Sequence, residues 1–441
     1  MFTFLKYLQP TSYFSLSRNS KGYVFPIIES IPKSVLEHLQ GDATYKSEIA
    51  KSYDLAWQAI HKGYISDANT IQTISPIPLH DEYVFIRKNF SSVWVFYVLL
   101  IRIFSFKKPF KEFRNWFITR STNRFRYIED TIVHDGWEQF QSQLIAESPK
   151  VSVVIPTLNR YHYLKDVLKD FEKQDYTNFE IIVVDQSEPF NSGFYDEFKL
   201  NINVIKQAEK ALWLARNTAI RNASGKFIAL SEDDVRIESD WISKHLKCID
   251  FFKADISAGV FYPEGQNLPK ARSFFMMASQ FATGNAMLYK SVFKEIGLFD
   301  RQFEKQRMGD GEFGLRAYLN GFKSISNPEA SCIDVKADVG GLREMGSWDA
   351  FRTKKWFAPR PIPSVLYFFR KYFGNKAAKY ALMRTVPLSI MPYQFKKNKA
   401  MLIIGALVSI LILPIVIVQV LKSWRMSNIK LREGELIERL N

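Results

Sequence analysis

The chain has 441 residues, of which 47% are hydrophobic and 15% aromatic, and its formal net charge is +15. This length leaves room for more than one domain, and the apolar content excludes a disordered chain. The positive charge indicates a partner of opposite sign, and the two cysteines, Cys248 and Cys332, are too few for a disulfide framework.

The first 149 residues contain no catalytic motif, but their character changes at residue 91. Residues 1–90 are mixed in composition, and nothing in them specifies a role. Residues 91–149 open with an apolar run, Ser92–Phe106, which KKPFKEFRNWFITRSTNRFRY follows. A run of this length is short for a membrane span, so we expect an interfacial or re-entrant helix. A buried helix with a solvated basic face is the alternative.

Residues 150–345 alternate between strand-like and helix-like segments, which predicts an α/β domain with a parallel sheet. The strand candidates are the apolar runs Val151–Ile155, Phe179–Val184 and Lys226–Leu230. Between the first two, Tyr163–Lys173 has the apolar spacing of a helix.

Polar residues follow each predicted strand, at the edge where open α/β sheets bind ligands. Residues 156–160 follow the first strand, Asp185 the second, and Glu232, Asp233 and Asp234 the third. One such aspartate often only caps the next helix, whereas three polar strand ends in succession predict a nucleotide pocket. The acidic triplet suits a hard divalent cation, and a solvated acidic turn is its alternative.

Residues 346–400 are basic and aromatic, and residues 350–432 contain no Asp or Glu. Residues 401–421 read MLIIGALVSILILPIVIVQVL, an uncharged stretch that reaches the ~20 residues needed for a span. We therefore expect a transmembrane helix over 401–421 and a tail over 422–441. Basic residues beside such a helix favour anionic lipid, and no motif for nucleic acid is present.

Five blocks of residues 150–345 resemble the bacterial family 2 glycosyltransferases with a GT-A fold. In chain order they are VSVVIPTLNRYHYLKDVL, FEIIVVDQSE, ARNTAIRNASGKFIALSEDDV, TGNAMLYKSVFKEIGLFD and GDGEFGLRAYLNGFK. The resemblance implies an α/β, Rossmann-like nucleotide-sugar domain with an N-terminal extension and a C-terminal membrane helix.

The resemblance also implies roles for single residues. Asp310 aligns with the catalytic base, and Asp234 with a ligand of Mg2+ or Mn2+ that Asp334 would assist, where relatives often carry a His. The expected donor-binding residues are Pro156, Thr157, Asp185, Arg216, Asn217, Glu232, Asp233 and Arg343. The residues expected to line the sugar and the acceptor are Gly284, Asn285 and Glu312. Glu312 is alternatively a structural carboxylate with Arg316 as its partner.

Several of these positions depart from the family pattern or have a second interpretation. Gly309 replaces the Glu that usually precedes the base, and Glu232 replaces the more usual Asp. Asp310 is also placed to cap the helix that follows it. Arg343 is suited to cover a diphosphate, with a surface position on a flexible loop as the alternative.

The implied function is inverting, metal-dependent transfer of one sugar from a nucleotide sugar, expected to be a UDP-sugar. The acceptor is expected to be lipid-linked or a glycan, in cell-surface polysaccharide biosynthesis. A processive polysaccharide synthase is one alternative, although the Gln-x-x-Arg-Trp motif is missing. A nucleotidyltransferase would need a Gly-rich basic loop after the first strand, and PTLNRYHYL is not such a loop. A catalytically degenerate membrane scaffold is the non-enzyme alternative.

The expected location is the inner (plasma) membrane, crossed once near the C-terminus. Nucleotide sugars are made in the cytosol, so residues 150–345 are expected to be cytoplasmic and the tail to lie on the other side. The basic, aromatic stretches 98–128 and 354–399 are expected to lie on the lipid surface.

Overall fold

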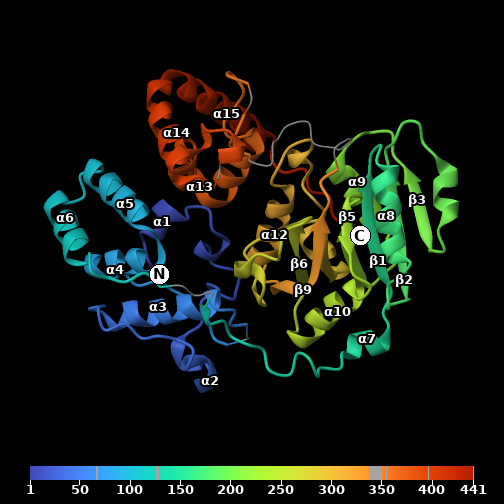
Figure 1. The fold of residues 1–441 in the computed structure, drawn as a ribbon, viewed down its shortest axis with the longest axis horizontal. Helices are drawn as coiled ribbons and strands as arrows, with labels where there is room; N and C mark the ends of the chain where they lie inside the picture. Colours follow the sequence, from blue (N-terminus) through green and yellow to red (C-terminus); the bar gives the residue numbers. More distant parts are fainter. Residues whose placement is uncertain (66–67, 126–128, 338–349, 354, 396, 441) are drawn as a thin grey trace.

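A mixed α/β domain lies beside two groups of helices, one from each end of the chain (Figure 1). The computed structural model describes residues 1–65, 68–125, 129–337, 350–353, 355–395 and 397–440. Arg343, a predicted donor-binding residue, lies outside these residues.

Within the described residues, the α/β domain contains a nine-stranded sheet with the order β3-β2-β1-β4-β8-β6-β9-β5, and β7 pairs with β9. Strands β3, β2, β1 and β4 are mutually parallel, whereas β8 is antiparallel to both of its neighbours. The strands are β1 (Val151–Thr157), β2 (Phe179–Asp185), β3 (Ile202–Lys206), β4 (Phe227–Ser231), β5 (Val235–Ile237), β6 (Ile256–Pro263), β7 (Met276–Met277), β8 (Asn285–Tyr289) and β9 (Ser324–Asp334).

The three predicted strands are confirmed to within two residues at each end, as is the first helix, α8 (Tyr161–Phe171). Strand β1 continues through Pro156, which was expected to end it. Its other neighbour, β4, pairs only with residues 151–154, so Pro156 lies where one side of β1 is open.

Alternate residues of β1 pack into cores on opposite faces of the sheet. Val153 and Ile155 pack with α8 and α10, whereas Val154 packs with α9 and α12. Because helices cover both faces, the parallel strands must be apolar throughout. The helices of this domain are α7 (Gln143–Glu147), α8, α9 (Leu212–Asn222), α10 (Trp241–Phe251), α11 (Lys290–Ile296) and α12 (Gly309–Leu319).

The N-terminal helices form a lobe that reaches the α/β domain. Within it, the buried Lys88 pairs with Asp54 at 2.6 Å. The hydroxyl of Tyr13 donates a hydrogen bond to the carbonyl of Gly311, so the lobe contacts α12 directly. Its helices are α1 (Leu5–Leu8), α2 (Lys33–Leu36), α3 (Glu48–His61), α4 (Leu79–Asn89), α5 (Ser92–Phe104) and α6 (Pro109–Ile118).

The C-terminal helices are α13 (Pro363–Thr385), α14 (Lys399–Leu411) and α15 (Leu413–Glu433). They correct the expectation of one helix over 401–421, because α14 and α15 meet at Ile412 with a bend of 89°. Pro414 then lies in the first turn of α15, where its missing N–H removes no helix hydrogen bond. No single helix in the described part of the chain is long and apolar enough to cross a membrane; only the bent pair, taken together, reaches that length and composition.

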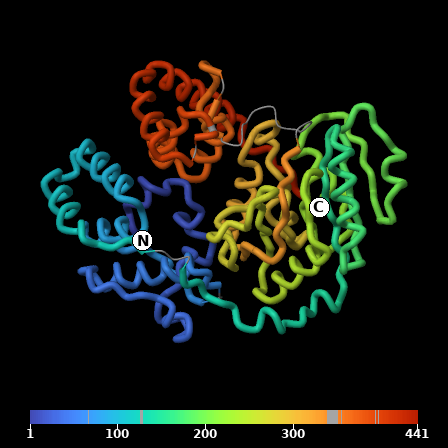
Figure 2. Tube along the Cα trace, viewed as in Figure 1, coloured from blue at the N-terminus to red at the C-terminus, as the bar shows by residue number. Residues whose placement is uncertain are grey.

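The tail after α15 returns to the α/β domain. Figure 2 shows the red end of the chain leaving the helices and running across to that domain. The amide of Leu436 donates to Asp300 at 2.9 Å, and the amide of Leu298 donates to the carbonyl of Glu438 at 2.8 Å. Arg221 also pairs with Glu438 at 2.6 Å. This differs from the expected placement of the tail across a membrane from the α/β domain.

Candidate active site

A cavity of about 400 Å3 opens at the carboxyl edge of the parallel strands. The chain runs outward from β1 to β2 and β3 before β4 pairs on the other side of β1, so this is the point where the strand order reverses. The lining contains eight of the predicted site residues: Pro156, Thr157, Glu232, Asp233, Asp234, Gly284, Asp310 and Asp334.

One arginine holds two of the predicted acidic residues. Arg160 contacts the carboxylate of Asp233 at 3.0 Å and that of Asp234 at 3.2 Å. The hydroxyl of Thr157 donates to the other oxygen of Asp233 at 2.7 Å, so β1 and the end of β4 are joined here. Burial raises the pKa of Asp233 to about 7, outweighing the lowering by Arg160, and the charge of Asp234 adds to the rise.

The carboxylates of Glu232, Asp234 and Asp334 line the cavity and offer the oxygen ligands that a hard divalent cation prefers. Asp334 ends β9 opposite Val235, beside the acidic triplet. Burial raises the pKa of Asp334, and the charges of Asp234 and Glu232 raise it further. A cation would relieve that repulsion. Among the described residues, no three His, Cys, Asp or Glu side chains are grouped closely enough to hold a metal ion as they stand.

Asp310 lies in the first turn of α12 and also lines the cavity. The N-cap of this helix is Met308, with φ of 80°, so Asp310 does not cap it as the alternative interpretation supposed. One carboxylate oxygen of Asp310 accepts the amide of Gly311 at 2.8 Å. A carboxylate in a first helical turn lies at the positive end of the helix dipole, a position that favours an acidic side chain.

Glu312 is fully buried and does not line the cavity, so its contacts are those of the structural carboxylate expected as the partner of Arg316. Arg316 contacts both of its carboxylate oxygens, at 3.0 and 3.1 Å. The hydroxyl of Tyr372, on α13, donates to it as well, and Lys371 lies 3.7 Å away. Glu312 therefore joins the helix that carries Asp310 to the C-terminal helices.

Replacing Tyr372 with Phe is expected to lower the free energy of unfolding by about 1–3 kcal/mol, the cost of removing one partner from a buried polar group. Chemical denaturation in detergent micelles measures this change. The same substitution at the half-buried Tyr262 is the control. Unchanged stability of the Tyr372 variant would show that this hydroxyl does not hold Glu312.

Asp185 lies at the end of β2 but is not among the residues that line the cavity. It is fully buried, and its carboxylate accepts hydrogen bonds from the hydroxyls of Tyr161 and Tyr195 at 2.7 and 2.8 Å. The amide of Ser187 donates to it at 2.8 Å. The carboxylate thus organises the β2 end of the site, and its contact with the donor base stays a prediction.

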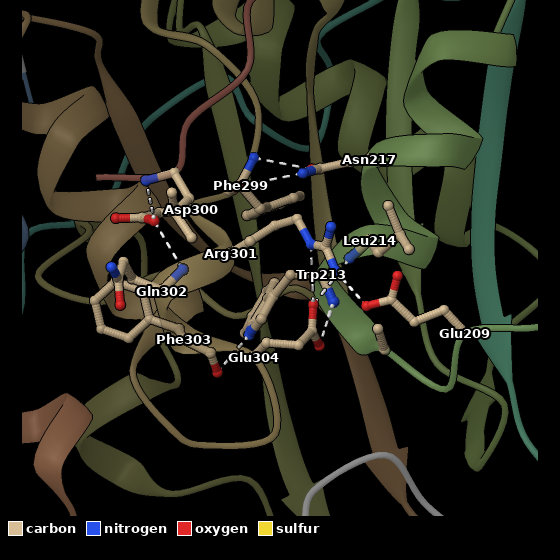
Figure 3. A network of polar contacts seen from close by, with 12 residues as sticks. Glu209, Trp213, Leu214, Asn217, Phe299, Asp300, Arg301, Gln302, Phe303 and Glu304 are labelled. Carbon is tan, nitrogen blue, oxygen red and sulfur yellow. Dashed lines mark hydrogen bonds and ion pairs between the residues drawn. The ribbon is translucent and has the colours of Figure 1, made fainter. Parts of the chain in front are cut away.

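Arg216 and Asn217 on α9 support the site from behind. Arg216 is fully buried and reaches Glu232 at 3.3 Å and the carbonyl of Ser231 at 3.3 Å. Asn217 bonds both backbone groups of Phe299 at 2.9 Å, as Figure 3 shows. Both residues make contacts within the protein, and the donor-binding role expected of them stays a prediction.

Asn285 was expected to line the sugar, but its amide is fully engaged inside the domain. Its oxygen accepts from Trp241 at 2.9 Å and lies 3.0 Å from a ring nitrogen of His245. Its nitrogen donates to the carbonyl of Ala330 at 2.8 Å. Of the two neighbouring residues expected to line the sugar, Gly284 lines the cavity and Asn285 does not.

A second network explains why glycine stands at position 309. The carboxylate of Glu304 accepts the backbone amides of Trp213 and Leu214, at the start of α9 (Figure 3). The indole of Trp213 donates to the carbonyl of Phe303 at 3.0 Å. A Cβ on Gly309 would lie 2.4 Å from this indole. The ring therefore excludes the Glu usual in the family, which explains an exchange that the sequence revealed without its cause.

Three basic side chains also line the cavity: Arg160, from the predicted polar segment 156–160, and Arg307 and Lys336, for which the sequence indicated no role. Each lies close in sequence to a predicted motif, three residues before Asp310 for Arg307 and two after Asp334 for Lys336. That proximity was the available signal. Cationic groups beside carboxylates suit a ligand that brings both an anion and a divalent cation.

Replacing Arg160 with Ala is expected to tighten the binding of Mn2+ in the absence of donor by about fivefold. The arginine pairs with Asp234, a carboxylate that the ion would use, and such a pair is worth about 1 kcal/mol. Calorimetric titration with MnCl2 measures the affinity. Arg236→Ala, which removes the partner of Asp170 outside the cavity, is the control. Unchanged or weaker binding would mean that Arg160 does not compete with the ion.

Part of the α/β domain matches a known protein family. Residues 152–303 match the family described as Glycosyl transferase family 2. The chain is 28% identical over 163 residues to the glycosyltransferase GlyA of Streptococcus pneumoniae, covering 36% of this chain and 22% of GlyA. It is 32% identical over 102 residues to the UDP-Glc:alpha-D-GlcNAc-diphosphoundecaprenol beta-1,3-glucosyltransferase WfgD of Escherichia coli, covering 22% of this chain and 38% of WfgD. The chain thus spans less than half the length of these two relatives.

Among solved structures, the chain is similar to the mannosyltransferase PcManGT from Pyrobaculum calidifontis in complex with GDP-Man and Mn2+. The two are 15% identical with a TM-score of 0.43, over 67% of this chain and 91% of the other. A likeness this distant carries no argument about donor or metal in this chain.

Proposed function

Because residues 152–303 match the family described as Glycosyl transferase family 2, we propose that the chain transfers one sugar from a nucleotide sugar, with inversion and with the help of Mg2+ or Mn2+. A UDP-sugar is the proposed donor. The observation that carries the proposal is that Asp310 and the acidic triplet line the same cavity, at the carboxyl end of the parallel strands.

In this mechanism Asp310 is the general base. Its carboxylate takes the proton of an acceptor hydroxyl, and the freed oxygen attacks the anomeric carbon of the donor. The new bond forms as the bond from that carbon to the diphosphate breaks on the opposite face, which inverts the anomeric configuration. The nucleoside diphosphate leaves with the electron pair of the broken bond.

The leaving diphosphate gains charge, which the cationic residues of the cavity are placed to offset. Arg160, Arg307 and Lys336 line that space. A divalent cation, which Asp234 and Asp334 would hold, supplies further charge neutralisation when bound. Thr157 holds Asp233 in position by the hydrogen bond described above.

The proposed acceptor is lipid-linked, or a glycan, in cell-surface polysaccharide biosynthesis. The name of WfgD describes an acceptor joined to diphosphoundecaprenol, which supports a lipid carrier for this chain as a proposal only. We place the protein at the inner membrane with its α/β domain in the cytoplasm, where nucleotide sugars are made.

A panel of nucleotide sugars, supplied to membranes that contain the full chain, tests this proposal. Release of a nucleoside diphosphate that depends on Asp310 and on added Mg2+ or Mn2+ is the expected result. A catalytically degenerate scaffold would release none with any donor. Products longer than one added sugar would instead favour a processive synthase.

A further inference from the structure

Helices α14 and α15 expose apolar stripes that no other part of the described chain covers. The exposed residues recur singly or in adjacent pairs with the period of a helix, so they lie along one side of each helix. They are Ile403, Ile404, Leu407, Ile410 and Leu411 on α14, and Leu413, Ile417, Val418 and Leu421 on α15. A helix in a water-soluble protein turns such a stripe toward a core, so these stripes indicate contact with an apolar phase.

Neither arm of this bent pair is suited to cross that phase alone. Helix α14 has 13 residues, which is about 20 Å at ~1.5 Å per residue, short of the ~30 Å hydrocarbon core. Helix α15 is longer but becomes polar after Leu421, where Lys422 and Arg425 are exposed. With a bend of 89° between them, the two arms cannot share one axis through a bilayer.

The tail fixes the side on which the chain leaves the helices. Its backbone is hydrogen-bonded to Leu298 and Asp300 of the α/β domain, and Glu438 pairs with Arg221 on α9. The residue after α15, Gly434, is only a few positions from these contacts. The end of α15 must therefore lie on the same side of any membrane as the α/β domain.

A second exposed apolar surface belongs to α5, α6 and the turn between them. Phe106 and Phe110 are each 91% exposed. The other members repeat at helical spacing: Val93, Phe96, Phe104, Phe113 and Phe117. Side chains on the opposite face of α5, such as Val98 and Leu99, are buried, so the exposed row is a distinct face and not a frayed helix.

Helix α13 connects the two surfaces. Its Arg384 lies over the ring of Trp94 on α5 at 4.9 Å, and its Tyr380 packs edge-on against Tyr7 of α1 at 4.9 Å. Figure 1 shows α5, α6, α14 and α15 on the half of the molecule away from β2 and β3.

Positive charge accompanies both surfaces. The exposed basic residues are Lys107, Lys108, Lys111, Arg114 and Arg120 near α6, and Lys355, Lys397, Lys399, Lys422 and Arg425 near α14 and α15. No Asp or Glu occurs between residues 350 and 432, and Glu112 of α6 is buried against Arg102. Apolar rows with a basic border match an anionic lipid surface, which attracts each of these basic residues.

We propose that the protein docks on one leaflet of an anionic bilayer through two elements, the α5–α6 surface and the α14–α15 elbow, and that it does not cross the membrane. The chain then dips into the leaflet twice and returns each time, so both of its ends lie on the side of the α/β domain. This inference rests on the proposed membrane location but not on the transfer chemistry.

The placement of the tail can be tested with two single substitutions, Arg439→Cys in the tail and Ser192→Cys in the α/β domain, both at exposed positions. The native Cys248 and Cys332 are buried, so the unsubstituted chain gives the background. Membrane vesicles from cells that make the full chain are treated with a membrane-impermeant maleimide, before and after detergent. Equal labelled fractions at both positions before detergent are expected. If, before detergent, Arg439→Cys is labelled in vesicles that protect Ser192→Cys, the tail and the α/β domain lie on opposite sides and the proposal is overturned.

Vesicle flotation tests the surfaces themselves. Phe106→Asp with Phe110→Asp, and separately Ile410→Asp with Leu411→Asp, are each expected to weaken binding to phosphatidylcholine vesicles containing phosphatidylglycerol by at least about tenfold. Val133→Asp, at an exposed valine outside both surfaces, is the control.

Each alternative occupant of these surfaces predicts a different flotation result. Equal binding to vesicles of phosphatidylcholine alone would overturn the anionic part of the proposal. Stable self-association without flotation, abolished by the same substitutions, would assign the surfaces to a second copy of the chain instead. Neither result depends on whether the protein transfers a sugar, so failure here is distinct from failure of the proposed function.

Discussion

Asp310→Asn is expected to lower sugar transfer by about 10²–10⁴-fold while leaving the affinity for the nucleotide sugar unchanged. The amide has nearly the shape of the carboxylate but cannot take a proton from the acceptor. Its oxygen can still accept the amide of Gly311, so the first turn of α12 is preserved. Single-turnover transfer measures the rate, and calorimetric titration measures donor binding.

Asp196→Asn, the same chemical change at an exposed position, is the matched control and should retain full activity. If the Asp310 variant loses donor binding together with transfer, Asp310 belongs to the donor pocket and another group must be the base. Arg307, which lines the same cavity, would then be expected to contact the donor as well.

The parallel strands were predictable because a sheet covered on both faces requires uninterrupted apolar runs, and few other structures do. The position of the cavity was predictable for a different reason. The carboxyl ends of parallel strands all lie at one edge of the sheet, so the polar residues that follow them come together there. Thr157 and Asp233 are 76 positions apart in the chain and hydrogen-bonded at this edge.

The exact role of each motif residue was less predictable, because it depends on partners distant in sequence. Asn285 and Asn217 sit in blocks typical of the family, yet their amides are used by His245, Trp241 and the backbone of Phe299. A sequence block places such a residue near the site, but only the folded structure shows whether its polar atoms face the cavity or the protein.

The C-terminal region illustrates a different limit. Composition alone cannot distinguish one long apolar helix from two short ones, because the break at Ile412 changes neither charge nor hydropathy. Pro414 was compatible with both, as a kink in a long helix or as part of the first turn of a second one. The return of Leu436 and Glu438 to the α/β domain carries no sequence pattern at all, since it uses mostly backbone groups.

Asp234→Ala is expected to reduce transfer by about three orders of magnitude with the fold intact. A divalent cation contributes several kcal/mol of charge stabilisation to a leaving diphosphate, and each ~1.4 kcal/mol is tenfold in rate. Asp234 follows β4 at the rim of the cavity, where truncation leaves no void in either core. The thermal midpoint should therefore remain close to that of the unsubstituted chain.

Chelation separates a metal ligand from a merely acidic lining. EDTA should abolish transfer by the unsubstituted chain, and Mg2+ or Mn2+ should restore it, whereas no excess of either ion should restore the Asp234 variant. Glu238→Ala, at an exposed carboxylate seven positions from Ser231 and away from the cavity, should behave like the unsubstituted chain. Full activity in excess EDTA would rule out metal dependence. The ion pairs between Arg160 and the two aspartates would then be the working state of the site, with the arginine in the place assigned to the cation.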